Sequence, residues 1–548
     1  MDYFDLVATR STEILSATAI ESGLEEATRN LGRHIGSTQQ AQRAHTLLDR
    51  FVYHETDRRT ARAISLALNI LVEFGRRIDN SEELASTKAT EGLLGLARKM
   101  QQDVTSTPKD ENVQRACEEA LTCVANAMLL RPGCKAHFAK ARGFALVTAI
   151  LQCTVLTSTA TFLCARCLFL GLTTSDDAQH CVDDLNLQKE LAAATNIYLD
   201  KERGLVQGMG GGSKCRDRFC PQQVIAELLK AAMSLCVLFQ RSFVSKKTNV
   251  ADDLLPTEHA AKFTELLSVC LSTLREIPVS PNGHLADAQK QAISVALGFS
   301  TLHPKCIQDA WLPPNASPPT DEWANVDRIY DIFEKLIDHA VTPNGKVADD
   351  LSGVANEYQT EIAPLALVLV RLMTEHIKVR EHLLQRVYPQ KGASDFTRLP
   401  EDRPGIAGKL VRLLRIPQGG MLPSAAGSFM LALLSHDVKQ FVMAVGYGNA
   451  AGYMLAQGIE IPADILEQVN REVAEDVPVD PVTGRAFSQA DADRELAAMT
   501  DEEKEREAER LFVLFERLNK TGVIQVQNPF KAAVESGRFE ELSDEDSK

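Results

Sequence analysis

The stretch "CEEALTCVANAMLLRP", from Cys117 to Pro132, is strongly apolar and has the periodicity of an α-helix. A similar stretch, "VIAELLKAAMSLCVLFQ", runs from Val224 to Gln240, and others follow at spacings of roughly 40 to 70 residues. They include "TARAISLALNILVEFGRR", "FLCARCLFLGLTT", "DAQKQAISVALGFSTLHP", "APLALVLVRLMTEH" and "SAAGSFMLALLSHD". A helix that is apolar on nearly all sides must be covered by neighbouring helices. With insertions, the spacing fits an armadillo or HEAT repeat of about 40 to 47 residues.

The composition supports packed helices. The 548 residues are 45% hydrophobic but only 6% aromatic, and Leu and Ala dominate. The formal net charge is −15 and the pI is near 5.4, which argues against nucleic acid as the main partner. All twelve cysteines fall between Cys117 and Cys306, mostly in apolar helical stretches, so we expect reduced, buried thiols.

These patterns predict an all-α protein, a right-handed armadillo/HEAT-repeat α-solenoid followed by an extended connector and a carboxy-terminal amphipathic helix. The expected parts are a solenoid over 1–458 with inserted loops at about 201–223, 303–323 and 388–405, a connector over 459–499, a helix over 500–520 and a flexible acidic tail over 521–548. The sequence starts without a signal-peptide pattern, and its longest apolar run, "APLALVLV", is too short to cross a bilayer. We therefore expect a soluble, cytoplasmic protein.

The expected carboxy-terminal helix has a clear start and one apolar face. Thr500 and Glu503 form a capping box. The apolar stripe that follows contains Leu511, Phe512 and Phe515, and the opposite face is dense with Glu, Lys and Arg. An exposed stripe of this size predicts docking onto another surface, either a partner or the last repeat of the solenoid.

The stretch "VGYGNAAGYMLAQG", from Val445 to Gly458, resembles a dinucleotide-binding fingerprint. Such a site needs a strand before the glycines and further parallel strands, whereas the flanks here are helical. We interpret it as a tight turn between helices, in which Gly446 and Gly448 take backbone angles closed to other residues and Asn449 caps the next helix. No cofactor and no direct nucleotide binding are expected.

Other superficial motifs also lack the residues that their chemistry needs. The loop "GMGGGSKC" (208–215) has no G-K-[ST] and is interpreted as a mobile loop. Cys164 and Cys167, with Cys215 and Cys220, match no common zinc module. The histidines form no HExxH motif, and no nucleophile–base arrangement can be argued from their order. We expect no catalytic centre and no metal.

Polar residues within the apolar helices are the candidate binding residues. An asparagine such as Asn126, on the innermost helix of an armadillo repeat, can hold a peptide amide through both its donor and its acceptor. The alternative is a helix-interior Asn that a neighbouring loop satisfies. Arg166 is a lone charge in "CARCLFL" and must reach a groove or an acid. Lys230 is in the same position, although its side chain could instead extend to solvent.

Motifs in the last third of the chain resemble those of the synembryn family, the resistance-to-inhibitors-of-cholinesterase proteins. They are, in order, "KLVRLL" (409–414), "GYGNAAG" (446–452), "DPVTGR" (480–485) and "MTDEEKEREAERLFVLFERLNKTGVIQ" (499–525). Upstream, "EALTCVAN" and "ARCLFLGLT" are similar to the family's internal repeats. The resemblance implies a solenoid that chaperones heterotrimeric G-protein α subunits (Gα) and acts on them as a guanine-nucleotide exchange factor. It also implies a cytoplasmic monomer, peripheral to the membrane through Gα at the cell cortex or the inner face of the plasma membrane.

By this resemblance, Asn126 and Arg166 match groove positions that hold the carboxy-terminal helix of Gα. Asn69 stands where the family pattern carries an arginine. The resemblance implies that arginines hold a carboxylate at this end of the groove, and this chain departs from that pattern at Asn69. A second family arginine falls near Glu73, and Arg76 or Arg77 is the candidate substitute.

Two further positions depart from the family pattern. Ser234 replaces a usual asparagine. The family's acidic phosphorylation segment is replaced by "IEIPADILEQVNREVAEDVP", which leaves Ser543, in "LSDED", as an alternative phosphorylation site. A peptide-binding armadillo adaptor without exchange activity remains the alternative function.

Overall fold

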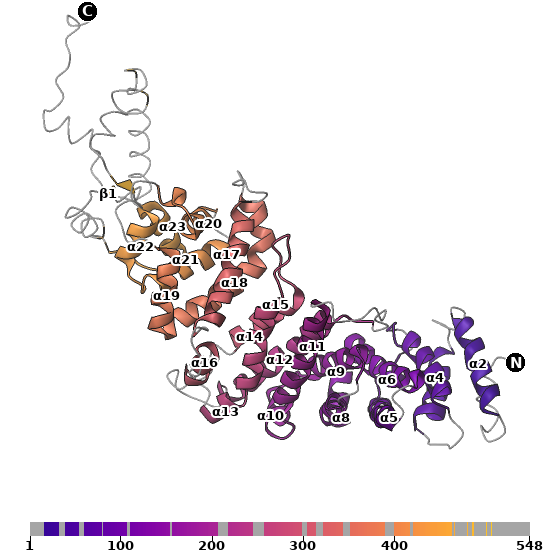
Figure 1. Ribbon diagram of the computed structural model, residues 1–548. Helices are drawn as coiled ribbons and strands as arrows, with labels where there is room; N and C mark the ends of the chain where they lie inside the picture. Colours follow the sequence, from indigo (N-terminus) through magenta and orange to yellow (C-terminus); the bar gives the residue numbers. More distant parts are fainter. Residues whose placement is uncertain are drawn as a thin grey trace, which may run out of the picture. The chain divides into compact units, whose positions relative to one another are not determined.

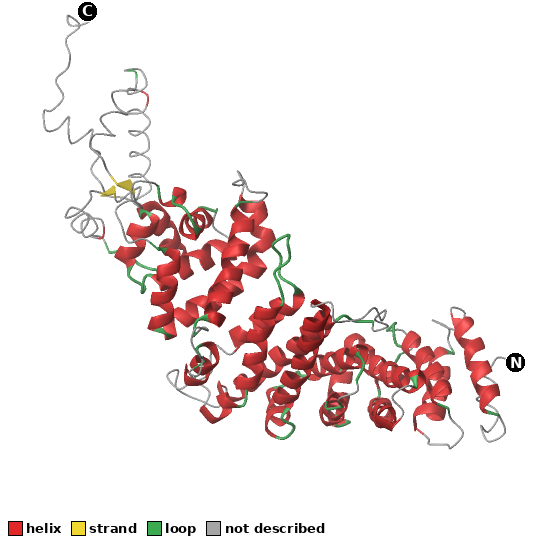
Figure 2. Ribbon diagram, viewed as in Figure 1, coloured by secondary structure: helices red, strands yellow, loops and turns green. Residues whose placement is uncertain are grey.

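The structure is a computed structural model, and it consists almost entirely of helices over the residues that it describes (Figure 2). These are residues 16–31, 39–53, 60–78, 81–106, 110–153, 156–206, 218–244, 257–298, 304–313, 322–342, 351–389, 399–416, 420–462, 465, 479–480, 485–486, 500 and 506. The chain divides into two compact units, 1–389 with 405–436, and 390–404 with 437–548.

The first unit contains a row of long helices, each in contact with the next (Figure 1). This first row consists of α4 (Ala61–Phe74), α6 (Glu111–Leu130), α9 (Ser158–Gly171), α12 (Pro221–Val244), α15 (Asp287–Gly298), α18 (Leu351–Glu375) and α21 (Met421–Leu433). Successive members lie far apart in sequence, so their contacts are those of neighbouring repeats.

A second row of helices runs beside the first. It consists of α5 (Thr87–Ser106), α8 (Gly143–Leu151), α11 (Leu187–Val206), α14 (Thr264–Glu276), α17 (Ala324–Val341) and α20 (Ile406–Leu414). Each member contacts the first-row helix that follows it in the chain, and each member before α20 also contacts the next member of its row. The apolar faces of the two rows are thereby buried against each other, and Phe74, Phe239, Phe333 and Phe429 of these helices are among the fully buried side chains.

A further helix, in most cases shorter than the two that follow it, precedes many of these pairs. They are α7 (Cys134–Lys140), α10 (Ser175–Asp183), α13 (Thr257–Ala261), α16 (Pro304–Trp311) and α19 (Ile377–Val387). The array begins with α2 (Ala17–Arg29), α3 (Gln40–Leu48), the π-helical turn η2 (Asp49–Tyr53) and the 3-10 turn η3 (Glu83–Ala85). One short helix followed by two longer ones is the armadillo arrangement. The prediction of an all-α armadillo/HEAT solenoid is confirmed for this unit.

Local sequence fixes where the first-row helices begin. The backbone N–H of Ala63 donates to the Thr60 hydroxyl oxygen over 3.1 Å at the start of α4, and Ala160 donates to Thr157 in the same way at α9. These threonines satisfy backbone donors that the first helical turn leaves free. α12 begins at Pro221, whose fixed φ suits the first helical position.

Two of the predicted loops are shorter than expected. Residues 201–206 complete α11, and residues 221–223 begin α12. Within the proline-rich stretch predicted as a loop over 303–323, α16 forms from Pro304 to Trp311. The error has a simple cause, since a proline at the first helical position starts a helix rather than breaking it. In the third predicted loop, 388–405, the 3-10 turn η8 covers Pro400–Asp402.

By length and apolar composition α12 could cross a membrane, and it is the one such helix found among the described residues. The segment Pro221–Phe243 contains an apolar stretch with a mean hydropathy of 1.4, but most of that stretch is buried inside the protein. α12 contacts α9, α10, α11 and α15, which are neighbours on several sides. It is therefore accounted for as a core helix of the array.

The second unit contains the glycine-rich turn. α22 (Val438–Val445) ends at Gly446, which has φ +82°, and α23 (Tyr447–Gln457) begins directly after it. Gly448 lies inside α23 with ordinary helical geometry, so the prediction of a special backbone angle there is wrong. Asn449 is also not the cap, because its side-chain amide donates back to the Val445 carbonyl over 2.8 Å.

Beyond α23, few residues are described. β1 (Val479–Asp480) pairs antiparallel with β2 (Arg485–Ala486), and Asp480 faces Arg485 in the register. This short ribbon falls within the predicted connector. The predicted helix over 500–520, with Leu511, Phe512 and Phe515, and the tail with Ser543 lie outside the described residues, except for Thr500 and Arg506.

Gly171 gives a test of packing between α7, α8 and α9. A Cβ there would lie 2.8 Å from two ring carbons of Phe138, which is fully buried and meets Phe144 edge-on at 5.1 Å. We expect Gly171→Ala to lower the free energy of unfolding by about 1–3 kcal/mol, because the ring has no room to move away. Urea denaturation followed by circular dichroism measures the change.

Gly95 in α5 is the matched control, because a Cβ there would meet nothing within 4 Å. Gly95→Ala should stabilise the protein by about 0.5–1 kcal/mol through the helix preference of alanine. Equal effects of the two substitutions would contradict the close packing at Phe138.

Candidate functional site

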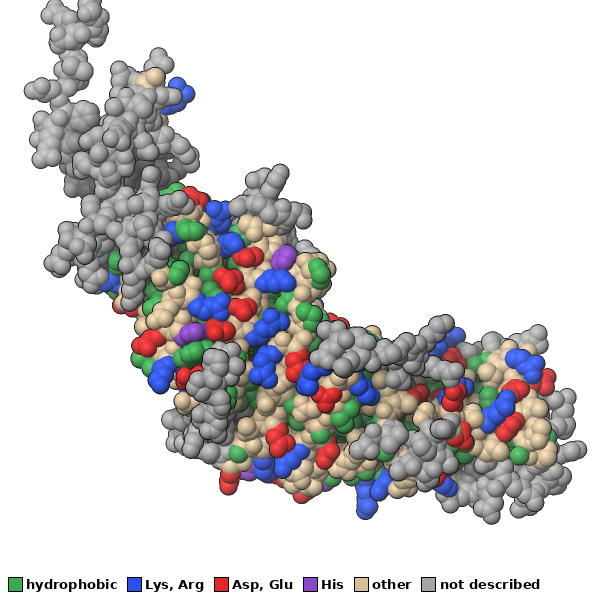
Figure 3. Space-filling model, viewed as in Figure 1, with side chains coloured by type: hydrophobic (Ala, Val, Ile, Leu, Met, Phe, Trp, Pro, Cys, Tyr) green, Lys and Arg blue, Asp and Glu red, His purple; other side chains and the backbone are tan. Residues whose placement is uncertain are grey.

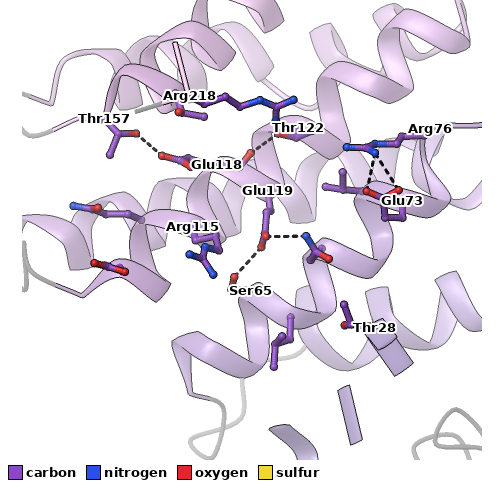
Figure 4. Close-up of a pocket in the computed structure, with 16 residues that line it drawn as sticks. Thr28, Ser65, Glu73, Arg76, Arg115, Glu118, Glu119, Thr122, Thr157 and Arg218 are labelled. Atoms are coloured by element: carbon purple, nitrogen blue, oxygen red, sulfur yellow. Dashed lines mark hydrogen bonds and ion pairs between the residues drawn. The ribbon is translucent and has the colours of Figure 1, made fainter. Parts of the chain in front are cut away.

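A polar cavity of about 660 Å³ opens beside the first helices of the array (Figure 4). Its lining comes from α2, α4, α6, the start of α9, and Arg218 just before α12. The residues are Thr28, Ser65, Leu66, Asn69, Val72, Glu73, Arg76, Glu111, Gln114, Arg115, Glu118, Glu119, Thr122, Thr157, Thr159 and Arg218. Charged and hydroxyl side chains dominate, so the cavity is suited to polar groups rather than to an apolar ligand.

One face of α6 supplies much of the lining. Gln114, Glu118 and Thr122 are spaced four residues apart, which places them on one side of the helix. Asn126 continues this spacing by one more turn and is half-buried. The structure therefore places Asn126 on the same face of α6 as the cavity.

Among the acids that line the cavity, Glu119 has the most strongly shifted pKa. Its carboxylate accepts hydrogen bonds from the Ser65 hydroxyl (2.9 Å) and the Asn69 amide (3.4 Å), both on α4. Burial raises the pKa of the Glu119 carboxyl to about 7, and the hydrogen bonds from Ser65 and Asn69 and the charge of Arg115 offset only part of this. Figure 4 shows the side chain directed toward Ser65.

Arg166 and Lys230 meet at one acid that sequence reasoning did not single out. The Arg166 guanidinium on α9 pairs with Glu227 of α12, and the Lys230 ammonium donates to the same carboxylate over 3.2 Å. The Glu227 side chain is only 2% exposed, whereas each cation is about one-third exposed. The requirement that Arg166 reach a groove or an acid is thus met by an acid between two first-row helices.

An aromatic stack lies next to Arg166. The rings of Phe162 on α9 and Phe219 are stacked, with centroids 3.8 Å apart and planes 10° apart. The Arg166 guanidinium lies 4.9 Å from the centroid of Phe162, and that of Arg218 lies 5.6 Å from Phe219. Cation–π contacts of this kind hold both arginines beside the stack.

The remaining candidates from the sequence are distributed along the first row. Asn69 lines the cavity and contacts Glu119, while Arg76 lines it and pairs with Glu73 at 2.9 Å. Arg77 is exposed and does not line the cavity, so of the two arginines singled out in the sequence only Arg76 lines it.

Sequence reasoning missed Glu118, Glu119 and Glu227. A signal existed, because each of these acids interrupts an otherwise apolar helix, in "CEEAL" and "VIAELLK".

The thiols and acids of the described residues form no group of three or more that could hold a metal ion. Cys164 and Cys167 are buried in α9, and burial raises the pKa of the Cys167 thiol to about 12. A thiol held in its protonated form is a poor metal ligand. Cys215 lies outside the described residues.

Comparison with known proteins identifies the family. The family model described as "Guanine nucleotide exchange factor synembryn" matches residues 67–538. The chain belongs to the synembryn family. The match includes α4 from residue 67 onward, the whole of α6 and the glycine turn at Gly446. The predicted family membership is confirmed.

Curated relatives are named as chaperones. The chain is 29% identical over 197 residues to a synembryn-like chaperone of Schizosaccharomyces pombe, covering 34% of this chain and 36% of the relative. It is 27% identical over 313 residues to Chaperone Ric-8A of Gallus gallus, covering 55% and 52%. It is 27% identical over 192 residues to Chaperone ric-8 of Caenorhabditis elegans, covering 33% of each. The chain thus spans about half or less of the length of these relatives.

Among solved structures, a chain from a study of the cadherin–β-catenin interaction matches with a TM-score of 0.33 and 12% identity, over 86% of this chain and 98% of that one. An engineered protein matches with a TM-score of 0.28 and 15% identity, over 62% and 96%. At such low TM-scores, neither match adds to the helical arrangement described above.

Because Arg166 pairs with the buried carboxylate of Glu227, we expect removal of the Arg166 charge to destabilise the protein. Arg166→Gln should lower the free energy of unfolding by about 1.5–3 kcal/mol, because a charge-assisted hydrogen bond to a buried acid is lost. Adding Glu227→Gln should recover much of that loss, since the buried charge is then also removed. Urea denaturation of the single and double variants measures both steps.

Arg62→Gln is the control for an exposed pair. Arg62 binds Glu25 and its side chain is 55% exposed, so its loss should cost at most about 1 kcal/mol. If the double variant were no more stable than Arg166→Gln alone, the pairing of Arg166 with Glu227 would not be the cause.

The raised pKa of the Glu119 carboxyl should make the free energy of unfolding depend on pH. Because the folded pKa of about 7 exceeds the ordinary value of 4.5, the folded protein holds a proton that the unfolded chain loses between these values. The stabilisation from the protonated carboxyl is complete below about pH 4.5 and disappears as the pH rises through 7. Glu119→Gln should therefore raise the melting temperature at pH 8 and change it little at pH 5. The exposed Glu111→Gln should change it at neither pH, and a pH-independent effect of Glu119→Gln would contradict the raised pKa.

Proposed function

We propose that this protein is a guanine-nucleotide exchange factor and folding chaperone for heterotrimeric G-protein α subunits. The observation that carries the proposal is the synembryn family match over residues 67–538. The chaperone names of the relatives support the same activity. In this proposal the protein acts on its partner by binding and not through a catalytic centre of its own.

The proposed mode of binding is the capture of a helix along the first row. An amphipathic helix binds a groove through residues that recur every three or four positions, which suits a row of parallel helices. Asn126 on α6 would hold the captured helix through its amide, which both donates and accepts. Arg166 and Lys230 expose about a third of their side chains beside Glu227, and they would meet acidic or carbonyl groups of the partner.

Captured in this way, the terminal helix of Gα would be drawn from its own domain, which weakens the guanine site. An exchange factor must favour the nucleotide-free state of its partner over the loaded state. By reciprocity, incoming GTP weakens the complex by the same factor. Such a mechanism needs no nucleotide site on this chain.

The carboxy-terminal segment has a second proposed role. The stripe of Leu511, Phe512 and Phe515 would lean on the nucleotide-binding domain of Gα and support its loosened switch region. Burial of each such side chain would contribute about 1.5–3 kcal/mol. We further propose that the protein is a cytoplasmic monomer that reaches the membrane surface through Gα. Ser543 is its proposed phosphorylation site.

An armadillo-type adaptor without exchange activity is the second candidate. Asn69 favours it, because the family pattern carries an arginine at this position and the groove chemistry differs here. Among the described residues of the visible face, Figure 3 shows acidic and basic side chains interspersed, without a large positive area of the kind that binds a nucleic acid.

Release of labelled GDP from purified Gα tests the two candidates. The full chain should accelerate GDP release by at least about tenfold, since binding energy of about 1.4 kcal/mol directed at the empty state suffices for that factor. It should also co-elute with nucleotide-free Gα and separate on addition of GTP. The adaptor would bind Gα or another protein without accelerating release, and that outcome would overturn the exchange activity.

A further inference from the structure

Buried glutamates join helices of the first row. Glu227 of α12 reaches back to α9, where it binds Arg166, and its second oxygen accepts from Lys230. Glu361 of α18 reaches back to α15, where Lys290 binds it at 2.9 Å, and His284 lies 3.4 Å from the same oxygen. Both glutamate side chains are at most 4% exposed. In each case a cation compensates the buried charge, as electrostatics requires.

Glu119 occupies the corresponding place between α4 and α6 but has neutral partners. It reaches back to Ser65 and Asn69 of α4, and neither carries a charge. Within the described part of the chain no lysine or arginine forms an ion pair with Glu119, although the charge of Arg115 acts on it from a distance. Glu119 is thus the acid of this series that lacks its cation.

Glu119 also differs from Glu227 and Glu361 in its surroundings. It lines the cavity of about 660 Å³, so a group from outside can approach it. Most nearby charges are acidic or already engaged, because Glu118 adjoins it and Arg76 is held by Glu73. The charged groups that face the cavity are Glu73 of α4, Arg76 just after it, Glu111, Arg115, Glu118 and Glu119 of α6, and Arg218.

We infer that the cavity receives a cationic side chain of the bound partner, an ammonium or guanidinium group, which pairs with Glu119 between Ser65 and Asn69. This inference deepens the proposed function, on which it rests, by naming the side chain that this end of the groove selects. A cation from the partner supplies what Arg166 and Lys290 supply at the other two acids. A partner carboxylate would instead meet the acid pair Glu118 and Glu119.

The titration of Glu119 gives the inference a second observable. Its carboxyl is partly protonated near pH 7, and pairing with a cation favours the charged form. Binding of the cation should therefore release a proton and strengthen as the pH rises from 6 to 8. Glu118, Glu111 and Glu73 are the other acids facing the cavity, so the Glu119→Gln variant must remove this pH dependence if Glu119 is its source.

A lysine scan of a synthetic peptide that copies the carboxy-terminal helix of Gα tests the inference on the full chain. Fluorescence anisotropy at pH 8 should reveal one lysine position that tightens binding to the wild type by roughly tenfold, as expected for a charge-assisted hydrogen bond to a desolvated acid. Glu119→Gln and Asn69→Arg should both abolish this gain, the first by removing the acid and the second by supplying the missing cation. Glu91→Gln on α5 and Glu265→Gln on α14 are the controls, because both side chains are exposed and neither lines the cavity, and both variants should retain the gain.

A second probe does not depend on Gα. Binding of n-butylguanidinium ion to the full chain, followed by saturation-transfer NMR, should be lost in Glu119→Gln and in Asn69→Arg but kept in both controls. The inference is overturned if neither the lysine scan nor the guanidinium ion distinguishes Glu119→Gln from Glu91→Gln. Failure of the proposed function looks different, because Gα and its peptide would then not bind while the guanidinium ion still would.

Discussion

Burial of each first-row helix between its neighbours is the constraint from which the rest of the structure follows. α12 contacts α9, α11 and α15, so polar groups on most of its faces have no access to water and need partners on adjacent repeats. Glu227 satisfies this need with Arg166 from the preceding helix, and Glu361 does so with Lys290. These ion pairs connect repeats that lie about 60 to 70 residues apart and favour one register between neighbouring helices.

The sequence predicted the array because its signal is local and repeated. Each first-row helix carries enough apolar residues to require coverage on several sides, and that requirement is visible without knowing the neighbours. The ends of the helices were harder to predict from the sequence. A proline-rich stretch contains α16, because proline both starts helices and breaks them, and sequence alone does not show which of the two it does at Pro304.

Part of the candidate site could be predicted from the sequence, because some of its residues are polar positions within apolar helices. Arg166 stood out as a charge among apolar residues, and the need for an acid followed from electrostatics, but the acid lies 61 positions away and only the fold brings it near. Asn69 and Glu119 interact across 50 positions in the same way. Gly446 and Gly448 show the limit at short range. Both fit a turn by composition, yet one residue with positive φ suffices to separate α22 from α23.

Asn69 shows how one substitution can change a groove without changing the fold. An asparagine can hydrogen-bond Glu119, but it does not neutralise the charge, so the cost of burying that carboxylate appears as a raised pKa. The corresponding interface between α9 and α12, with Arg166 and Glu227, shows that a cation fits between neighbouring first-row helices. Because the helices pack through their apolar residues, the polar position between them is free to vary. In the proposed mode of binding, the charge that a partner brings is set by a residue that contributes little to the packing, which would allow related solenoids to differ in specificity while keeping one architecture.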